Sequence, residues 1–171
     1  IEFITSVRLV DLTREEADLG IRYGFGEYEG LVSSQLVKGT LMPVCSPAVV
    51  QASDGNLTTL LSTARRIQTA GYNEWRDWSR IANIDISATQ PAYVIEDFLV
   101  AIKAITMGQG LALLPHILVQ DQLASGELVQ FCDTPLEIEH TFHLAHTTAS
   151  VRRPFVQTVV EWLRTSLAHL N

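Results

Sequence analysis

The sequence is poor in basic residues and in cysteine. Its 171 residues include 12 Lys and Arg against 19 Asp and Glu, which gives a formal net charge of -7. A surface of that sign repels phosphate backbones, so we do not expect this chain to bind nucleic acid by itself. The two cysteines, Cys45 and Cys132, are too few for a disulfide framework and lack the spacing of a metal site. We expect both to be small buried apolar side chains.

Long apolar runs are also missing. The best candidate for a membrane span, residues 98–119, is interrupted by Lys103, by two glycines and by Pro115. The chain has no cationic start followed by a short apolar run, which a signal peptide would require. Because the sequence begins with Ile1 and not with Met, we expect the natural N-terminus to lie further upstream.

Motifs of catalysis and phosphate binding are lacking as well. The sequence has no G-x-S-x-G elbow and neither a G-x-G-x-x-G nor a G-x-x-x-x-G-K-[ST] loop. His140, His143 and His146 are spaced by three, but on a strand this spacing places successive rings on opposite faces, which disfavours a metal site. We therefore predict no enzyme activity, no catalytic residue, no metal and no cofactor.

What the sequence does contain is enough apolar material for a core. Hydrophobic residues make up 47% of the chain and charged residues 18%, the balance of a globular protein. The clearest element is a helix over residues 96–107, with apolar residues at helical spacing and Gly108 at its end. The apolar run 111–115 then predicts a strand covered on both faces. Helix, glycine turn and buried strand in this order indicate an α/β fold.

Weaker patterns predict the other elements. Strands are expected over residues 3–12, 18–24, 36–44, 66–69, 127–131 and 141–146, and helices over 116–124 and from Pro154 onward. Thr13 is expected to cap a short helical turn, with Glu16 completing a capping box. Trp75 and Trp78 are expected at a turn or helix start, with both indoles on the surface. The polar stretch 52–61 is the best candidate for a crossing between two lobes.

Glu96 and Asp97 open the clearest helix, and two interpretations stay open. They can form a solvated first turn, where the helix dipole favours acidic residues. Alternatively, this helix N-terminus faces a cleft in which its free N–H groups bind a ligand. Two acids there would weaken the attraction for an anion and favour a ligand with an ammonium group or several hydroxyls.

Four motifs in order resemble the effector-binding domain of LysR-type transcriptional regulators. The resemblance is to the branch that holds the glycine-cleavage activator and the β-lactamase regulator. The motifs are DLGIRYG at residues 18–24, LMPVCSP at 41–47, AITMGQGLALLP at 104–115 and QLASGELV at 122–129. Together they extend over nearly the whole chain.

This resemblance implies a type II periplasmic-binding-protein-like α/β fold, with two lobes joined by two crossing strands. One lobe would comprise residues 1–52 and 141–171, and the other residues 53–140. A small effector, amino-acid-like or another small polar metabolite, would bind between the lobes. The effector-binding residues that the resemblance implies are Tyr23, Gly24, Thr69, Ala70, Gly71, Glu96, Asp97, Phe98, Phe142 and His143.

The resemblance also implies a cytoplasmic bacterial transcription factor that forms a homodimer or homotetramer and does not bind membranes. Family members bind DNA through an N-terminal winged helix-turn-helix. We expect this chain to lack that domain and also to lack the first strand and helix of the effector domain. The alternative is a periplasmic solute-binding protein of a transporter, which shares the fold. The motifs at 18–24 and 41–47 favour the regulator. An enzyme on this fold would need a convergent acid–base pair, which we do not find.

Overall fold

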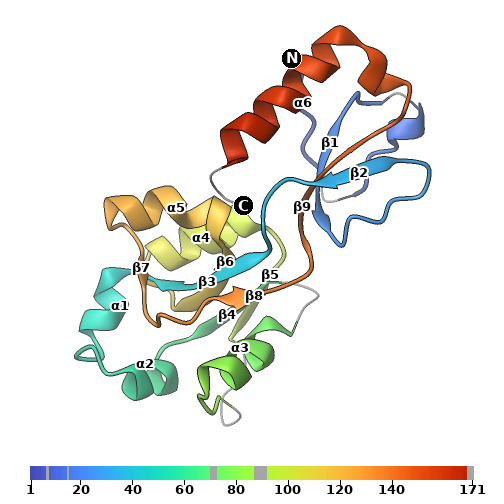
Figure 1. Ribbon diagram of the computed structural model, residues 1–171. Helices are drawn as coiled ribbons and strands as arrows, with labels where there is room; N and C mark the ends of the chain where they lie inside the picture. The colour runs from blue at the N-terminus through green and yellow to red at the C-terminus, as the bar shows by residue number, and fades with distance from the viewer. Residues whose placement is uncertain (7, 15, 70–72, 87–91, 169–171) are drawn as a thin grey trace. The chain divides into compact units, whose positions relative to one another are not determined.

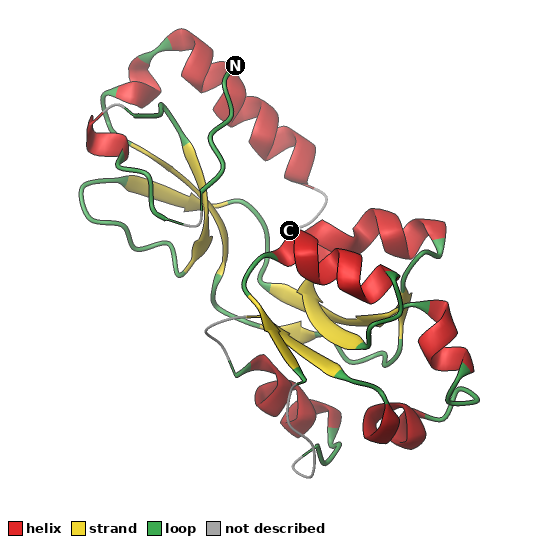
Figure 2. Ribbon diagram, turned by 180° about the vertical axis from the view of Figure 1, so that it is seen from behind, coloured by secondary structure: helices red, strands yellow, loops and turns green. Residues whose placement is uncertain are grey.

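The computed structural model describes residues 1–6, 8–14, 16–69, 73–86 and 92–168. The chain divides into two compact units, unit 1 (Ile1–Gly39 and Ile138–Asn171) and unit 2 (Thr40–Glu137). It therefore passes from one unit to the other twice. Each unit has its own sheet and its own helices (Figure 1, Figure 2), which confirms the predicted α/β class.

Unit 1 is built on a three-stranded sheet with the order β1-β9-β2. Its elements are the 3-10 helix η1 (Leu12–Arg14), β1 (Gly20–Gly24), β2 (Val32–Gln35), β9 (Thr141–His146), the 3-10 helix η2 (Ser150–Arg152) and α6 (Pro154–Leu167). Both outer strands pair antiparallel with β9. Ser34 of β2 lies beside Leu144 of β9 and accepts a hydrogen bond from Arg164 of α6 (3.3 Å). Helix α6 therefore covers the sheet face that carries Leu144, which is fully buried.

Unit 2 contains a six-stranded sheet, with the path β5-β4-β6-β3-β7 and β8 paired to β3. Its elements are β3 (Thr40–Cys45), α1 (Pro47–Gln51), α2 (Leu57–Thr63), β4 (Arg66–Thr69), α3 (Glu74–Ala82), β5 (Tyr93–Ile95), α4 (Phe98–Thr106), β6 (Leu111–Pro115), α5 (His116–Ser125), β7 (Val129–Gln130) and β8 (Leu136–Glu137). Helices α4 and α5 lie on one face of the sheet and α3 on the other (Figure 1). Every residue of β6 is buried between these layers, as its apolar run predicted.

Three strands of unit 2 end at one edge of its sheet. Strands β4, β5 and β6 are parallel, so their last residues, Thr69, Ile95 and Pro115, lie at the same edge. Strand β3 runs antiparallel to β6, with Leu41 opposite Pro115, and therefore starts at the same edge. Since β8 pairs with the first residues of β3, both segments that connect to unit 1 leave unit 2 at this edge.

The two connecting segments touch through their backbones. In unit 1, Ile138 N donates to Gly39 O (2.7 Å), and a Cβ at Gly39 would collide with Ile138 O. Further into unit 1, Leu36 N donates to Phe142 O (2.9 Å). A buried glycine is thus required where the two segments run closest together.

The boundary between the units differs from the expected one. Residues 40–52, expected in the first lobe, form β3 and α1 of unit 2, and residues 138–140 belong to unit 1. Pairing with β6, β7 and β8 fixes β3 in the sheet of unit 2. The polar stretch 52–61 forms a turn and the start of α2, where Asn56 Oδ1 accepts from Thr59 N (2.9 Å). Its polarity marks a helix cap and not a crossing.

The N-terminal alternation does not form the expected strand. The described residues of 1–11 contain no strand, and residues 1–6 are exposed. Alternating apolar residues specify a strand only where a neighbouring strand offers hydrogen bonds and a surface to cover. The apolar stretch 36–44 also does not form one strand, because residues 36–39 link β2 to β3.

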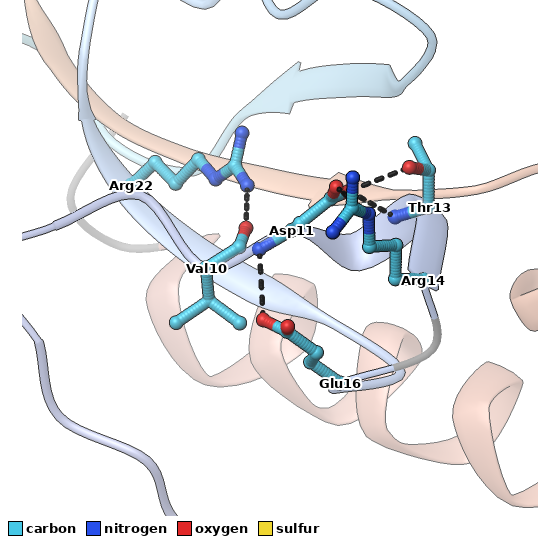
Figure 3. A network of polar contacts seen from close by, with 6 residues as sticks. All are labelled: Val10, Asp11, Thr13, Arg14, Glu16 and Arg22. Carbon is cyan, nitrogen blue, oxygen red and sulfur yellow. Dashed lines mark hydrogen bonds and ion pairs between the residues drawn. The ribbon is translucent and has the colours of Figure 1, made fainter.

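The cap of the first helical turn lies two residues earlier in the sequence than we expected. Asp11, and not Thr13, caps η1: its Oδ1 accepts from Thr13 N (2.9 Å) and Thr13 Oγ1 (2.5 Å), as Figure 3 shows. Glu16 closes the turn, because its Oε2 accepts from Asp11 N (3.3 Å). The Thr13 hydroxyl and backbone, with Arg14, lower the pKa of the Asp11 carboxyl.

Both indoles expected on the surface are buried. Trp75 and Trp78 lie in α3 and are nearly inaccessible to solvent. Each Nε1–H donates to a backbone oxygen, Trp75 to Ile67 and Trp78 to Thr134, both at 2.8 Å. Because these hydrogen bonds satisfy the polar atoms, the rings can pack with Phe131 in the interior.

Within the described residues, helices long and apolar enough for a membrane crossing are absent.

Gly110 provides a test of the close approach between the α4–β6 turn and Arg65, the residue before β4. Its φ is +138°, and a Cβ there would collide with Arg65 O, which accepts from Leu111 N (2.8 Å). We expect Gly110→Ala to lower the free energy of unfolding by about 3 kcal/mol or more in urea denaturation. The matched control is Gly126→Ala, where no atom lies within 4 Å of the added Cβ and φ is +75°, and its expected cost is about 1 kcal/mol. Equal losses would contradict the close approach at Gly110.

Candidate functional site

In unit 2 the expected site residues gather at the edge where β4 and β5 end. Thr69 is the last residue of β4, is 6% exposed, and pairs with the last residue of β5. Glu96 and Asp97 follow β5 directly and are exposed. The structure thus brings Thr69 into the neighbourhood of the two acids. Two further expected residues, Ala70 and Gly71, lie outside the described residues.

Asp97 caps α4, which begins at Phe98 and not at Glu96 as predicted. Its Oδ1 accepts hydrogen bonds from Leu99 N (2.8 Å) and Val100 N (3.1 Å). The N–H groups that could hold a ligand anion are therefore bonded to a carboxylate of the chain itself. This helix end disfavours an anion and presents two exposed acidic side chains.

Phe98 differs from its two acidic neighbours. Its side chain is half-buried and packs against a core cluster formed by β3, β4, α4, β6 and α5. It therefore fixes the start of α4 on the sheet. Of the three residues expected to line the site at this helix, the two acids are the exposed ones.

In unit 1 the expected residues lie at the strand ends from which the connecting segments depart. Tyr23 pairs with Phe142, and Gly24 pairs with Thr141. The Tyr23 ring lies 5.0 Å from the Phe142 ring and 5.2 Å from the His140 ring, measured between centroids. His140 was not predicted as a site residue. The signal that points to it is its position directly before β9, at the same end of the sheet as Tyr23.

His143 lies on the opposite face of this sheet. It is 7% exposed, and its Nδ1 is 3.1 Å from Thr141 O. A Cβ at Gly26 would lie 2.5 Å from His143 Nε2, so the glycine allows the loop after β1 to pass directly over the ring. The structure brings Tyr23 and Phe142 together and separates His143 from both.

Other side chains of the unit close the face that carries His143. The Arg22 guanidinium lies 4.8 Å from the centroid of the Tyr28 ring, and its Nη2 donates to Val10 O (2.6 Å), as Figure 3 shows. The Tyr28 hydroxyl would lie 3.1 Å from a Cβ at Gly24. The half-buried Tyr23 and Phe142 rings are thus on the face that this loop does not cover.

Burial shifts the pKa of three side chains, those of His140, Glu74 and Cys45. It lowers the pKa of His140, which favours the neutral ring, and it raises the pKa of the Glu74 carboxyl, the first residue of α3. It also raises the pKa of the Cys45 thiol to about 11, which keeps this buried thiol protonated and unreactive. Cys132 is half-buried. Across the described ranges, clusters of His, Cys, Asp or Glu suited to a metal ion are absent.

Comparison with known protein families gives a match over nearly the whole chain. A model described as the LysR substrate binding domain matches residues 1–168. The chain belongs to the LysR substrate-binding domain family. This membership confirms the resemblance carried by the four sequence motifs.

Curated LysR relatives resemble the chain at low identity. The glycine cleavage system transcriptional activator of Escherichia coli K12 is 23% identical over 158 residues, which cover 91% of this chain and 52% of the relative. The HTH-type transcriptional activator AmpR of Enterobacter cloacae is 28% identical over 159 residues, 90% of this chain and 52% of the relative. The chain thus spans about half the length of the curated relatives it matches, and their names confirm the branch that the motifs indicated.

Solved structures show the same fold. The AmpR effector binding domain from Citrobacter freundii matches with a TM-score of 0.80 and 22% identity, covering 94% of this chain and 80% of that chain. The regulatory domain of CrgA, a LysR-type regulator from Neisseria meningitidis, matches with a TM-score of 0.74 and 16% identity. The match covers 95% of this chain and 81% of that chain. This LysR domain therefore has the type II periplasmic-binding-protein-like fold, as predicted.

His140 makes the stability of the LysR domain depend on pH. Because burial lowers its pKa below the ordinary 6.5, the unfolded chain takes up a proton before the folded chain does. The stability that the neutral ring contributes is complete above about pH 6.5 and is lost as the pH falls from there toward the folded pKa. We expect His140→Phe to reduce the loss of unfolding free energy between about pH 7.5 and pH 5.5, measured by urea denaturation.

Phe25→Leu is the control for His140→Phe. The Phe25 ring lies 5.5 Å from the His140 ring, so this change alters the same aromatic packing without removing a titratable group. It should lower stability at every pH and keep the wild-type pH dependence. A His140→Phe chain with the wild-type pH dependence would show that His140 is not the group responsible.

Proposed function

We propose that this chain is the effector-sensing domain of a bacterial LysR-type transcription factor that acts in the cytoplasm. The match to the LysR substrate binding domain over residues 1–168 carries the proposal. The named relatives are transcriptional activators, two of them described above. In the whole protein, DNA binding would reside in a separate helix-turn-helix domain, and this domain would bind a small molecule without converting it. The solute-binding protein of a transporter is not favoured, because the named relatives are regulators.

In each unit taken by itself, the expected effector-binding residues gather at one end of the sheet. Thr69, Glu96 and Asp97 lie at the edge of unit 2 from which the connecting segments leave. Phe142 lies near the start of β9, which follows one of these segments, and Tyr23 of β1 pairs with it. Small ligands of α/β folds bind beyond the carboxyl ends of parallel strands. We propose these residues as effector-binding residues, and Gly24, Ala70 and Gly71 remain further candidates from the sequence.

The chemistry of this site favours an effector that carries an ammonium group or several hydroxyls. The Asp97 carboxylate already accepts hydrogen bonds from the N–H groups of Leu99 and Val100 at the start of α4. Glu96 and Asp97 attract positive charge, and the Tyr23 and Phe142 rings offer π faces to a cation. An amino-acid-like compound or another small polar metabolite meets these requirements.

The proposed mechanism is a shift between arrangements of the two units. An effector that binds one arrangement more tightly increases the population of that arrangement. In an oligomer, the same shift would change how the DNA-binding domains are presented, and the coupling would be reciprocal between effector and DNA. The connecting segments at Gly39 and Ile138 are the covalent route for this coupling.

A homodimer, or a homotetramer of such dimers, is the proposed assembly. Exposed apolar side chains lie on the edge strand β5 (Val94), on helix α4 (Leu99 and Val100) and at the C-cap of α4 (Met107). Exposed apolar patches on soluble proteins commonly mark interaction surfaces. We propose that a second copy of the chain covers this patch.

Leu99→Glu tests the patch. A charge there would oppose burial against a second copy, so the variant should sediment as a monomer at concentrations where the wild-type chain sediments as a dimer. Ile81→Glu is the matched control, because Ile81 is similarly exposed but lies on α3, and it should sediment like the wild type. A wild-type chain that remains monomeric, or equal dimerisation of both variants, would contradict this interface.

Three compounds of similar size test the effector class. Serinol has an ammonium group and two hydroxyls, L-serine adds a carboxylate, and glycerate has the carboxylate but no ammonium group. We expect serinol and L-serine to raise the thermal unfolding midpoint by roughly 5–10 °C at about 100 times their Kd. Glycerate should have little effect, because the exposed acids repel it.

Asp97→Asn is the matched variant for this test. The Asn side chain still accepts hydrogen bonds from the N–H groups of α4, so the cap is retained while the negative charge is lost. It should weaken serinol binding and leave the unfolding midpoint of the free chain nearly unchanged. Stronger stabilisation by glycerate than by serinol would refute the proposed effector class. The absence of stabilisation by all three compounds would refute it as well.

A further inference from the structure

An aromatic row, formed by Phe142, Tyr23, His140 and Phe25, lies on one face of the unit 1 sheet. Its ring centroids are 5.0 Å apart from Phe142 to Tyr23, 5.2 Å from Tyr23 to His140 and 5.5 Å from His140 to Phe25. The successive ring planes are inclined by 57°, 87° and 61°. Because neighbouring rings are steeply inclined, their faces point in several directions, as in the aromatic sites that surround a bound cation.

Exposure to solvent increases toward the Phe25 end of the aromatic row. His140 is 6% exposed, Tyr23 and Phe142 are half-buried, and Phe25 is 62% exposed. The folded core gains little free energy from a ring that remains largely in water. A ligand that covers Phe25 would remove this apolar surface from water, so the row offers a ligand more than it offers the core.

The charges near the aromatic row favour a cation. The loop over residues 25–31 carries two exposed acids, Glu27 and Glu29, and its sequence contains no Lys or Arg. Burial lowers the pKa of His140, which favours the neutral ring, so this residue does not repel a positive charge. Arg22 lies on the opposite face of the sheet, opposite His143 in the register, with its guanidinium over the Tyr28 ring.

A methylated ammonium group suits aromatic faces better than a primary one. A primary ammonium has three N–H donors, and each donor that leaves water for a ring face loses a hydrogen-bond acceptor. A trimethylammonium group has no N–H donor, and its methyl groups bury apolar area against the rings while the positive charge interacts with the π faces. The aromatic row is therefore selective for a methylated cation.

We propose that the aromatic row binds a trimethylammonium group of the effector. This inference rests on the proposed function, in which Tyr23 and Phe142 are effector-binding residues, and it narrows the proposed effector class. The effector is then a small metabolite with a quaternary ammonium group. Phe25 and His140 join the residues that contact it.

Three compounds separate the charge from the methyl groups. Choline has both, ethanolamine has the charge on a primary ammonium, and dimethylbutanol, the neutral carbon isostere of choline, has the methyl groups without the charge. The measurement is an NMR titration of the isotope-labelled 171-residue chain, with Kd values taken from the amide shifts of Tyr23, Phe25 and Phe142. We expect choline to bind about tenfold more tightly than either of the other two. Equal or tighter binding of ethanolamine or dimethylbutanol, or the absence of shifts with choline, would overturn the proposal.

Variants of Phe25 test the π face itself. Phe25→Leu keeps an apolar side chain and should weaken choline binding about fivefold, whereas Phe25→Trp provides a stronger π face and should tighten it about twofold. The matched control is Phe155→Leu, the same change at a ring on α6 that is 58% exposed, and it should bind choline like the wild type. Loss of affinity in both leucine variants, or weaker binding by Phe25→Trp than by Phe25→Leu, would contradict a cation–π contact at Phe25.

A parallel titration with serinol separates this inference from the proposed function. If serinol shifts the amides of the proposed binding residues and choline binds no more tightly, the effector class stands and the trimethylammonium inference has failed. If choline shifts Tyr23, Phe25 and Phe142 while no compound shifts Thr69 or Asp97, the aromatic row binds the cation and the proposed binding residues of unit 2 have failed. The two claims can therefore fail independently.

Discussion

Backbone contact between the two connecting segments is the constraint on which the rest of the structure depends. Ile138 N donates to Gly39 O, and the space beside Gly39 is too small for any side chain. Because the segments run together there, they must enter unit 2 at one edge of its sheet, where β3 begins beside β8. Because β3 is antiparallel to β6, this is also the edge at which β4, β5 and β6 end. The connection between the units and the candidate binding groups thus share one location for topological reasons.

In the function that we propose, Asp97 determines what kind of ligand this edge can accept. A helix N-terminus beside the ends of parallel strands is ordinarily suited to anions. Here the Asp97 carboxylate accepts hydrogen bonds from the N–H groups of Leu99 and Val100. The start of α4 therefore favours ligands with cationic or hydroxyl groups over anions. On the unit 1 side, aromatic rings and a buried, neutral His140 add surface without adding charge. The selectivity we propose therefore comes from a capping residue, and its charge can be removed while the cap is kept.

Local patterns in the sequence predicted the elements that depend on local interactions. The apolar run of β6, the helical spacing of α4 and the first-turn proline of α6 all gave elements of the right type and nearly the right bounds. Expectations failed where distant partners decide: the N-terminal alternation found no pairing strand, and Trp75 and Trp78 found backbone acceptors that allowed burial. The contacts of His140 were also missed, because they arise from side-chain packing that no spacing in the sequence encodes.

The central claim is that the proposed effector-binding residues bind a small polar molecule with an ammonium group. Amide chemical shifts of the isotope-labelled chain, followed by NMR during a titration with serinol, test it most directly. We predict saturable shifts with one common Kd at Tyr23 and Phe142 of unit 1 and at Thr69 and Asp97 of unit 2. The absence of shifts at these residues, or different Kd values among them, would contradict the proposed set of binding residues.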